Sequence, residues 1–313
     1  MELEKVRLIN WAWSKFLYID LINQIIWDKK YNNIADWFLG SWNLLLNISK
    51  NADKYIGIDN IKLIPNLFQW VNSWNIVEIK EEDYWNIVNQ YNNFKEKEYY
   101  VFRDHWNEKF ANNDYDIDFF LRTIMLLKMC SNSMVRFNSK WVFNQGFRLI
   151  AKSASDKWEW FFTDRKISTI VKETNKLLKI LKENNFEFRV DSFLNQYKKF
   201  WKGDLLLLDP PYILAEWKGW IYQAGEKAWN ETKEKEILEF LLNDYEWDFL
   251  YFNFTKVIID WVEHKHNLLL DFIDKYNEKK WKLKLYHLRE KVGTWQWRKE
   301  SNRSVEELII TNI

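Results

Sequence analysis

The stretch Leu205–Ile213, LLLLDPPYI, constrains the fold of this chain more than any other segment. Four consecutive leucines predict a short strand that is buried on both faces, as in a parallel sheet. Pro210 and Pro211 then end the strand, because they remove two backbone donors and fix φ at two successive positions. Asp209 and Tyr212 are therefore expected at the carboxyl edge of the sheet, where open α/β sheets bind their ligands.

The tetrapeptide DPPY suits a site that binds an amino group on an aromatic ring. The Asp209 carboxylate and the Pro210 carbonyl can both accept hydrogen bonds from an exocyclic –NH2, which draws its lone pair out of conjugation. Tyr212 can stack on the ring, as enzymes that act on flipped-out bases require. DPPY resembles motif IV of the amino-methyltransferases, which move a methyl group from S-adenosyl-L-methionine to an amino nitrogen. The alternative, a buried strand followed by a proline-marked turn, stays open on this motif alone.

Composition limits the class of protein. The chain has 313 residues, of which 47% are hydrophobic and 29% charged, and this predicts a globular protein of one or two domains. A net charge of +1 gives no overall attraction to nucleic acid, so any DNA affinity must come from a local basic face. No apolar run reaches membrane-spanning length, and the first residues do not resemble a signal peptide.

The numbers and positions of cysteine and histidine indicate the redox compartment of the protein and whether it could bind a metal. The one cysteine, Cys130, excludes a disulfide framework and a cysteine-based zinc site, and favours a reducing, cytoplasmic setting. His264 and His266 form the one close histidine pair. We interpret this pair as a solvated approach to a helix, in preference to a metal site, and we expect no metal.

Two segments near the N-terminus resemble cofactor motifs of the Dam-type DNA adenine methyltransferases. Residues 11–15, WAWSK, resemble motif X, and this implies that Trp11, Ala12 and Lys15 lie near the methionine end of the cofactor. Residues 36–43, DWFLGSWN, resemble motif I, in which a strand, a tight glycine turn and a helix let the backbone approach the cofactor. The resemblance implies cofactor contacts from three residues of motif I: Phe38, Gly40 and Ser41.

A third segment completes the expected cofactor-binding half. Residues 55–60, YIGIDN, predict a second strand, and Asp59 at its end matches the acid of motif II. Acids at this position hold a ribose or an adenine edge in nucleotide-binding sheets. The spacing of about 20 residues between the glycine turn and Asp59 is typical of a βαβ unit.

Helical spacing of apolar residues dominates from Lys62 to about Ile150, which predicts an inserted helical domain over 61–150. Residues 1–60 and 151–313 would then form the catalytic domain. The end of the insert, SNSMVRFNSKWVFNQGFR, resembles the family segment R-(Y/F)-N-x-x-G-x-F-N, with Trp141 at the glycine position. Its polar and cationic residues fit phosphate and base-edge contacts: Arg136, Asn138, Lys140 and Asn144. A hairpin that closes the domain is the alternative.

The remaining elements alternate between helices and strands. A helix is expected to begin over Leu44–Ile48, and an amphipathic helix is expected over Lys166–Leu181. After these we expect the strand Phe186–Val190, a helix near Phe193–Phe200, the strand Asp248–Phe252, the helix Leu268–Tyr276 and the closing strands Leu283–Leu288 and Val305–Thr311. The order predicts a mostly parallel α/β sheet with a terminal β-hairpin. The motif resemblance implies that this is the Rossmann-like sheet of S-adenosylmethionine-dependent methyltransferases.

The motif order from residue 8 to 312 resembles the Dam-like family, whose target-recognition domain lies between the cofactor and catalytic motifs. The resemblance implies methyl transfer to adenine N6 in double-stranded DNA, with S-adenosyl-L-methionine as cofactor. The catalytic residues would be Asp209, Pro210, Pro211 and Tyr212, with Asp209 also beside the cofactor. We expect a monomer, and a cognate restriction endonuclease stays open. The alternatives are an inactive DNA-binding relative and an amino-methyltransferase for RNA, cytosine N4 or a protein glutamine amide.

Tryptophan and glycine contents are both unusual. The chain holds 7 glycines and 21 tryptophans, whereas a chain of this length holds roughly 22 glycines at the usual frequency. Trp13, Trp42 and Trp141 stand at family glycine positions, and a turn glycine would suit Trp247, Trp261, Trp295 and Trp297. Trp11 and Trp229 match family tryptophans. Either the chain is a decayed relative, or UGA codons that mean glycine in the source have been translated as tryptophan. The shortfall of glycine and the excess of tryptophan agree in size, and this favours recoding of glycine codons as tryptophan.

Overall fold

The computed structural model describes residues 5–9, 14–40, 42–48, 52–73, 78–133, 135–148, 161–196, 199, 203–214, 229–259, 261–280, 282–289 and 304–313. The chain divides into two compact units. Unit 1 comprises Met1–Ile19, Gly40–Ser49 and Ile61–Arg189, and unit 2 comprises Asp20–Leu39, Lys50–Asn60 and Val190–Ile313. The expected insert, 61–150, lies within unit 1, which also takes in residues assigned above to the catalytic domain. The functional assignment of the domains stays a prediction.

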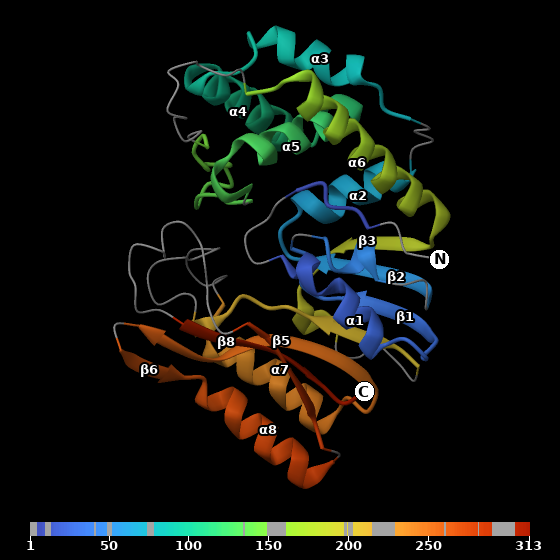
Figure 1. Cartoon of the computed structure of the whole chain (residues 1–313), viewed down its shortest axis with the longest axis vertical. Helices are drawn as coiled ribbons and strands as arrows, with labels where there is room; N and C mark the ends of the chain where they lie inside the picture. Colours follow the sequence, from blue (N-terminus) through green and yellow to red (C-terminus); the bar gives the residue numbers. More distant parts are fainter. Residues whose placement is uncertain are drawn as a thin grey trace. The chain divides into compact units, whose positions relative to one another are not determined.

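Unit 2 is built on a mostly parallel sheet (Figure 1). Its strands are β1 (Tyr31–Asp36), β2 (Ala52–Asp59), β4 (Leu205–Leu208), β5 (Asp248–Ile259), β6 (Val262–Lys265), β7 (Lys284–Arg289) and β8 (Ser304–Thr311). Within this unit they follow the order β2-β1-β4-β5-β8-β7, with β6 paired to β5. The first four are parallel, whereas β8 runs antiparallel to both β5 and β7. The expected α/β class and closing pair of strands are confirmed.

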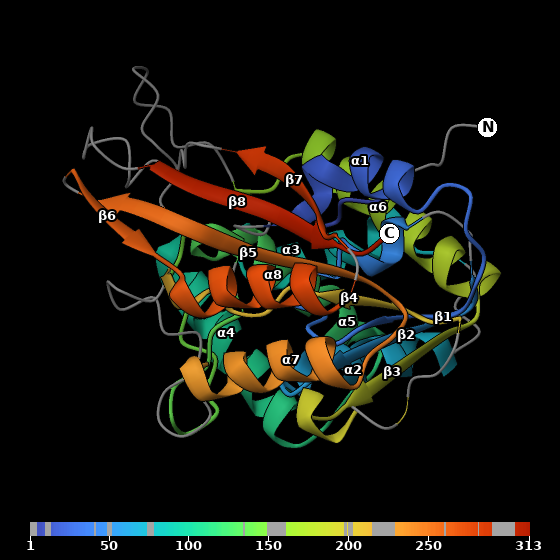
Figure 2. The ribbon, with the colours of Figure 1, turned by 90° about the horizontal axis from the view of Figure 1, so that it is seen from below.

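Burial of the central strand follows from its four leucines, all of which are inaccessible to solvent. Leu206 and Leu208 face the same layer as Phe249, Tyr251 and Ile310, because alternate residues of neighbouring strands point to one face. Two helices fill that layer, α7 (Glu231–Asn243) and α8 (Asn267–Lys279), which lie side by side across the sheet (Figure 2). A shorter helix, α1 (Ile19–Ile25), precedes β1.

Helices α7 and α8 are each capped at the N-terminus by a side chain. The Asn230 side chain accepts from the Lys233 N–H at the start of α7, and His266 Nδ1 accepts from the Leu269 N–H at the start of α8. The histidine pair thus does lead into a helix. His266 is buried and not solvated: it directly follows β6, and its N–H donates to the Thr255 carbonyl of β5.

Unit 1 is mainly helical, as expected. Its elements are the 3-10 turns η1 (Lys15–Tyr18), η2 (Leu45–Asn47) and η3 (Ser131–Ser133), the helices α2 (Leu63–Ser73), α3 (Glu81–Gln90), α4 (Glu96–Ala111), α5 (Ile117–Met129) and α6 (Asp164–Glu183), and the strand β3 (Phe186–Val190). No helix among the described residues is long and apolar enough to cross a membrane.

Three expected elements differ from the prediction. The helix over Leu44–Ile48 is only the turn η2, because the Asn47 side chain binds the Val6 N–H and C=O and holds the turn against the N-terminal segment. The described start of the helix expected near Phe193–Phe200 is the turn η4 (Phe193–Asn195), and residues 197, 198 and 200 lie outside the described residues. Strand β5 runs seven residues past Phe252, because both β8 and β6 pair with its second half.

The turn between β5 and β6 carries a tryptophan in a left-handed conformation. Only Asp260 and Trp261 separate the paired residues Ile259 and Val262, and Trp261 has φ 69°. Two-residue hairpin turns of this kind favour Asp-Gly, because both positions need positive φ. The geometry at Trp261 is therefore that of a turn glycine, as the sequence predicted.

Replacing Trp261 by glycine is expected to raise the free energy of unfolding by about 1 kcal/mol, the usual strain of an L-residue in this region. Little burial is lost, since Trp261 is 80% exposed. Urea unfolding of Trp261→Gly and of the unchanged chain measures the difference. Trp27→Gly is the matched control, because Trp27 is 70% exposed and lies outside the left-handed region. Equal changes in both variants would contradict the prediction.

Candidate active site

Carboxylates follow three parallel strands of unit 2 at one edge of the sheet. Asp36 ends β1, Asp59 ends β2, and Asp209 follows β4. Asp36 is buried, and its Oδ1 accepts from the Phe38 N–H at 3.0 Å, which turns the chain away from the strand. Because Asp36 lies opposite Leu207 in the register, Asp209 extends beyond it at the carboxyl end. The structure thus places Asp59 and Asp209 at the edge that the sequence predicted.

The tetrapeptide predicted to be catalytic, Asp209–Tyr212, is held by the hydroxyl of its own tyrosine. Tyr212 Oη lies 2.8 Å from Asp209 Oδ1 and 3.2 Å from Glu307 Oε1, and the tyrosine donates to these carboxylates. Its ring meets Phe254 edge-on at 4.5 Å between centroids. Burial, then the charges of Asp209 and Glu307, raise the pKa of Tyr212 far above its usual value, so the phenol stays protonated. Pro210 is buried and Pro211 is half-buried.

A second buried carboxylate, Glu234 in α7, lies beneath the same edge. Its Oε2 accepts from Trp229 Nε1 at 2.6 Å, and its Oε1 accepts from Asn253 Nδ2 at 2.8 Å and from the Tyr251 hydroxyl. Burial followed by the Glu234 charge raises the pKa of Tyr251 far above its usual value. His266 Nε2 lies 3.3 Å from Glu234 Oε1. Glu234 therefore joins α7, β5 and the start of α8 through its two oxygens.

Replacing Glu234 by glutamine is expected to lower the free energy of unfolding by about 1–3 kcal/mol, because a buried donor loses its acceptor. Both carboxylate oxygens accept hydrogen bonds, whereas an amide supplies one acceptor and turns an N–H toward the other donors. Urea unfolding measures the loss. Glu231→Gln changes an exposed carboxylate in the first turn of the same helix, and should cost less than about 0.5 kcal/mol. A similar loss in both variants would contradict this account.

An aromatic cluster adjoins the cofactor motifs in unit 2. Phe38, Phe193 and Trp229 contact one another, with ring centroids 5.2 to 5.6 Å apart. Trp229 uses its indole N–H for Glu234, and this specific contact fits a tryptophan at that position. Phe38, expected at the cofactor, thus lies half-buried beside two rings that the sequence did not assign to the site.

Asp191 is a further carboxylate at this edge that sequence reasoning missed. Its N–H donates to the Asp59 carbonyl at 3.1 Å. Burial acts to raise the pKa of Asp191, but hydrogen bonds from Asn195, the Ser192 N–H, Lys199 and Gln196 outweigh it and lower the pKa. The available signal was its position directly after the expected strand Phe186–Val190, the same rule that selected Asp59 and Asp209.

Motif X and motif I are joined inside unit 1. Asn43 Nδ2 donates to Ser14 Oγ at 2.9 Å, and Ser14 Oγ in turn accepts from the Phe16 N–H and begins η1. Lys15 is buried in this turn. Gly40 has φ 38°, the left-handed conformation expected of a glycine turn. Trp11, Ala12, Trp13 and Ser41 lie outside the described residues.

The expected DNA-contact segment forms a hairpin in unit 1. Phe137 and Phe143 form an isolated antiparallel bridge, and the Asn138 N–H donates to the Val142 carbonyl at 3.0 Å. Asn138 Oδ1 accepts from the Lys140 and Val142 N–H groups, so its oxygen is committed to the turn. The four predicted contact residues are all exposed: Arg136, Asn138, Lys140 and Asn144. The segment is thus a hairpin, and both of its predicted roles, closing the domain and contacting DNA, stay predictions.

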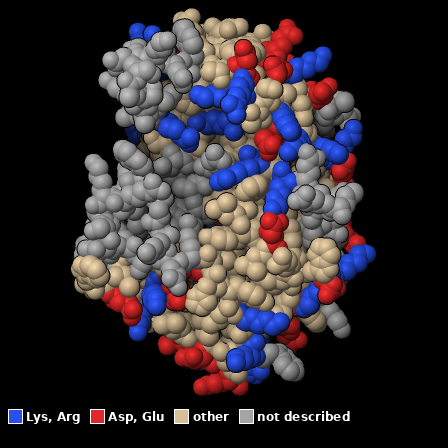
Figure 3. All heavy atoms as spheres, in the orientation of Figure 1, with Lys and Arg blue, Asp and Glu red and all other residues tan. Residues whose placement is uncertain are grey.

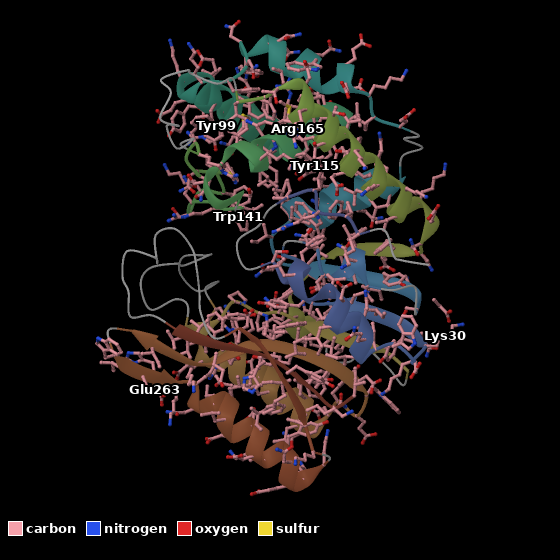
Figure 4. The ribbon with its side chains drawn as sticks, in the orientation of Figure 1. Lys30, Tyr99, Tyr115, Trp141, Arg165 and Glu263 are labelled. Carbon is pink, nitrogen blue, oxygen red and sulfur yellow. The ribbon has the colours of Figure 1, made fainter. Side chains whose placement is uncertain are left out.

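Charge on unit 1 is compatible with an anionic partner. Lys and Arg side chains gather across the middle of this unit on the face drawn in Figure 3. Trp141 lies at the tip of the hairpin beneath them (Figure 4). Among the residues the structure describes, no group of three or more His, Cys, Asp or Glu could hold a metal ion.

The family follows from a comparison with known proteins. A family model described as D12 class N6 adenine-specific DNA methyltransferase matches residues 11–265. The chain belongs to this family. The match spans motif X, motif I, the insert and motif IV, and so covers every residue assigned above to the site except Glu307 and His266.

Two curated relatives align with nearly the whole of this D12 class chain. The modification methylase StsI of Streptococcus sanguinis is 24% identical over 288 residues, which is 86% of this chain and 39% of the relative. The type II methyltransferase M.FokI of Planomicrobium okeanokoites is 23% identical over 304 residues, 93% of this chain and 41% of the relative. The chain thus spans about two fifths of the length of these relatives.

Two of the tryptophans that the sequence resemblance places at glycine positions have positive φ. Trp42 in motif I has φ 50°, and Trp141 in the hairpin has φ 59°. Trp141 follows the turn of a three-residue hairpin loop, at the position where glycine in the left-handed region is usual. Trp42 is buried edge-on against Phe68, with 5.3 Å between centroids. Among the described non-glycine residues with positive φ, three of eight are tryptophan.

The backbone conformation of these tryptophans bears on the hypothesis that they are recoded glycines. Asparagine, which accounts for another three of the eight, visits the left-handed region readily, whereas large aromatic residues adopt it rarely, and Phe94 is the one other aromatic residue among the eight. Trp42, Trp141 and Trp261 therefore occupy glycine conformations in three separate turns. Trp247 is absent from this group and packs against the core of unit 2. Trp295 and Trp297 lie outside the described residues.

Proposed function

We propose that the chain transfers a methyl group from S-adenosyl-L-methionine to N6 of adenine in double-stranded DNA. The observation that carries this proposal is the position of Asp209 and Pro210, directly after a fully buried strand and tied in place through Tyr212. The Asp209 carboxylate and the Pro210 carbonyl are two acceptors on rigid backbone, and together they could bind the two hydrogens of one amino group. The names of the two relatives, a modification methylase and a type II methyltransferase, support the same reaction.

The residues present fit the proposed cofactor. Gly40 adopts the left-handed turn that lets backbone approach a ligand. In unit 2, Asp59 would accept hydrogen bonds from ribose hydroxyls and Phe38 would contact the adenine ring. The resemblance adds Trp11, Ala12, Lys15, Gly40 and Ser41 as contacts, with Asp209 beside the methyl donor. When bound, the cofactor supplies a methyl group activated on a sulfonium.

The chain acts on the amino group by positioning and by accepting hydrogen bonds. Asp209 and the Pro210 carbonyl draw the nitrogen lone pair out of the ring, which makes the nitrogen nucleophilic. The nitrogen gains a methyl group and loses a proton, for which Asp209 is the proposed acceptor. Tyr212 would stack on the extruded base, and Pro211 keeps the loop rigid. The reaction needs no covalent intermediate. Removing the amino group from water and aligning it with the methyl group would supply the rate acceleration.

The hairpin of unit 1 is the proposed DNA contact. Arg136 and Lys140 would bind phosphates, and Asn138 and Asn144 would reach base edges through their amide groups. The enzyme would act in the cytoplasm as a monomer. A restriction endonuclease that cuts the same target is the proposed partner, in line with the relative named as a modification methylase.

The test is incubation of the chain with unmethylated DNA and methyl-labelled S-adenosylmethionine, followed by digestion and separation of the nucleosides. The expected result is label in N6-methyladenosine. Label in N4-methylcytosine, or in RNA offered in parallel, would assign another amino-methyltransferase activity. DNA binding without any label would identify an inactive DNA-binding relative.

A further inference from the structure

Glu307 is a buried carboxylate at the catalytic edge that lies 95 residues away from motif IV. It lies in β8 opposite Phe254 of β5, and its side chain is fully shielded from solvent. Its Oε1 is 3.2 Å from Tyr212 Oη, and the same hydroxyl is 2.8 Å from Asp209 Oδ1. One phenol thus connects a carboxylate of the terminal hairpin with the catalytic carboxylate.

Two buried carboxylates beside one hydroxyl lower the stability of the folded protein, and this cost indicates a functional role. Like charges repel more strongly in a buried site than in water, and burial of a carboxylate is itself unfavourable. A phenol offers only one proton, so Tyr212 shares it between the two oxygens. The Phe254 ring restrains the Tyr212 ring from a second direction. The hydroxyl is therefore fixed in space, and with it the Oδ1 edge of Asp209.

We propose that Glu307 is a positioning residue for Asp209, and that it acts through the Tyr212 hydroxyl. Glu307 holds the hydroxyl, and the hydroxyl holds the Asp209 carboxylate in the orientation that receives the amino group. This inference rests on the proposed methyl transfer. It gives Tyr212 a role for its hydroxyl that is separate from stacking by its ring.

The neighbouring residue supplies a matched control. Glu306 lies on the opposite face of β8, where it accepts from the Thr255 hydroxyl and lies 3.4 Å from His287 Nδ1. Glu306→Leu and Glu307→Leu thus remove adjacent carboxylates of the same strand, and only the second faces Tyr212. Tyr212→Phe keeps the ring and removes the hydroxyl alone. Glu307→Gln keeps an oxygen acceptor of nearly the same shape.

Single-turnover methylation at saturating DNA and cofactor measures the effect on rate. Tyr212→Phe and Glu307→Leu should each lower the rate about 10- to 100-fold, with dissociation constants for DNA and cofactor within about threefold. The double variant should be no slower than the slower single variant, because both changes break one link. Glu307→Gln should recover most of the rate. Multiplicative losses, an unaltered rate in Glu307→Leu or an equal loss in Glu306→Leu would overturn the proposal.

A second readout does not depend on catalysis. Carbon-13 NMR of protein labelled at tyrosine Cζ and aspartate Cγ identifies Tyr212 and Asp209 by the signals lost in Tyr212→Phe and Asp209→Asn. Both signals should shift in Glu307→Leu and stay in place in Glu306→Leu. Unshifted signals in Glu307→Leu would overturn the positioning role. Shifted signals in a chain that methylates no nucleic acid would retain the link and reject the proposed function.

Discussion

Glycine at positions 13, 42 and 141 is expected to raise the rate of DNA methylation at least about 100-fold over that of the chain as written. A misplacement of reacting groups by about 1 Å costs a factor of this size, and restoring the glycine turns should remove it. Trp42 and Trp141 hold left-handed conformations that favour glycine, with φ 50° and 59°. The resemblance to motif I implies that glycine at position 42 would also let the backbone approach the cofactor closely. Initial rates with labelled cofactor and unmethylated DNA measure the gain.

Trp229→Gly is the opposite control. Its indole N–H binds Glu234 and its ring packs on Phe38 and Phe193, so glycine there should destabilise unit 2 and restore nothing. The gene sequence supplies an independent test. UGA codons are expected at positions 13, 42, 141 and 261, and UGG is expected at 229. UGG at 42 and 141, or no gain in rate from the glycine variant, would reject recoding.

Asp209→Asn in the glycine-restored chain is expected to lower the methylation rate at least about 1,000-fold, in the range found when a preorganised reaction-centre group is removed. The change replaces an acceptor with an N–H donor that faces the substrate amino group, and it removes the proposed proton acceptor. DNA affinity should stay within about threefold, since phosphate contacts supply most of it. Single-turnover rates and DNA titrations measure the two quantities.

Asp204→Asn is the control for Asp209→Asn: it tests whether the loss of any carboxylate next to β4 lowers the methylation rate. Asp204 lies at the other end of the strand, where its Oδ1 accepts from the Asn33 backbone and side chain. The variant should unfold more easily and keep its rate per folded molecule. A rate for Asp209→Asn within tenfold of the parent would reject Asp209 as the central catalytic group.

Local pattern was sufficient for much of the fold. Four leucines followed by two prolines define a buried strand with a sharp end, and both features depend on neighbouring residues alone. The amphipathic helix over Lys166–Leu181 lies within α6 for the same reason, since a period of 3.6 is a property of the segment. The acids after the expected strands could be placed at one edge because parallel strands end together.

Elements that depend on distant contacts were misjudged. The turn η2 was expected as a longer helix, and β5 was expected to end near Phe252. In each case the end of the element is set by partners elsewhere in the chain. Asn47 binds Val6, and the second half of β5 pairs with β6 and β8.

The sequence by itself determined the α/β class, and it predicted the DPPY tetrapeptide as the catalytic segment and the positions where tryptophan would stand for glycine. Only the tertiary structure decided what holds that tetrapeptide. The register of β8 on β5 brings Glu307 to Tyr212, and the packing of α7 places Glu234 beneath Asn253. Such contacts join residues that no period or motif relates, because strand register and helix packing follow from the whole core and not from any one segment.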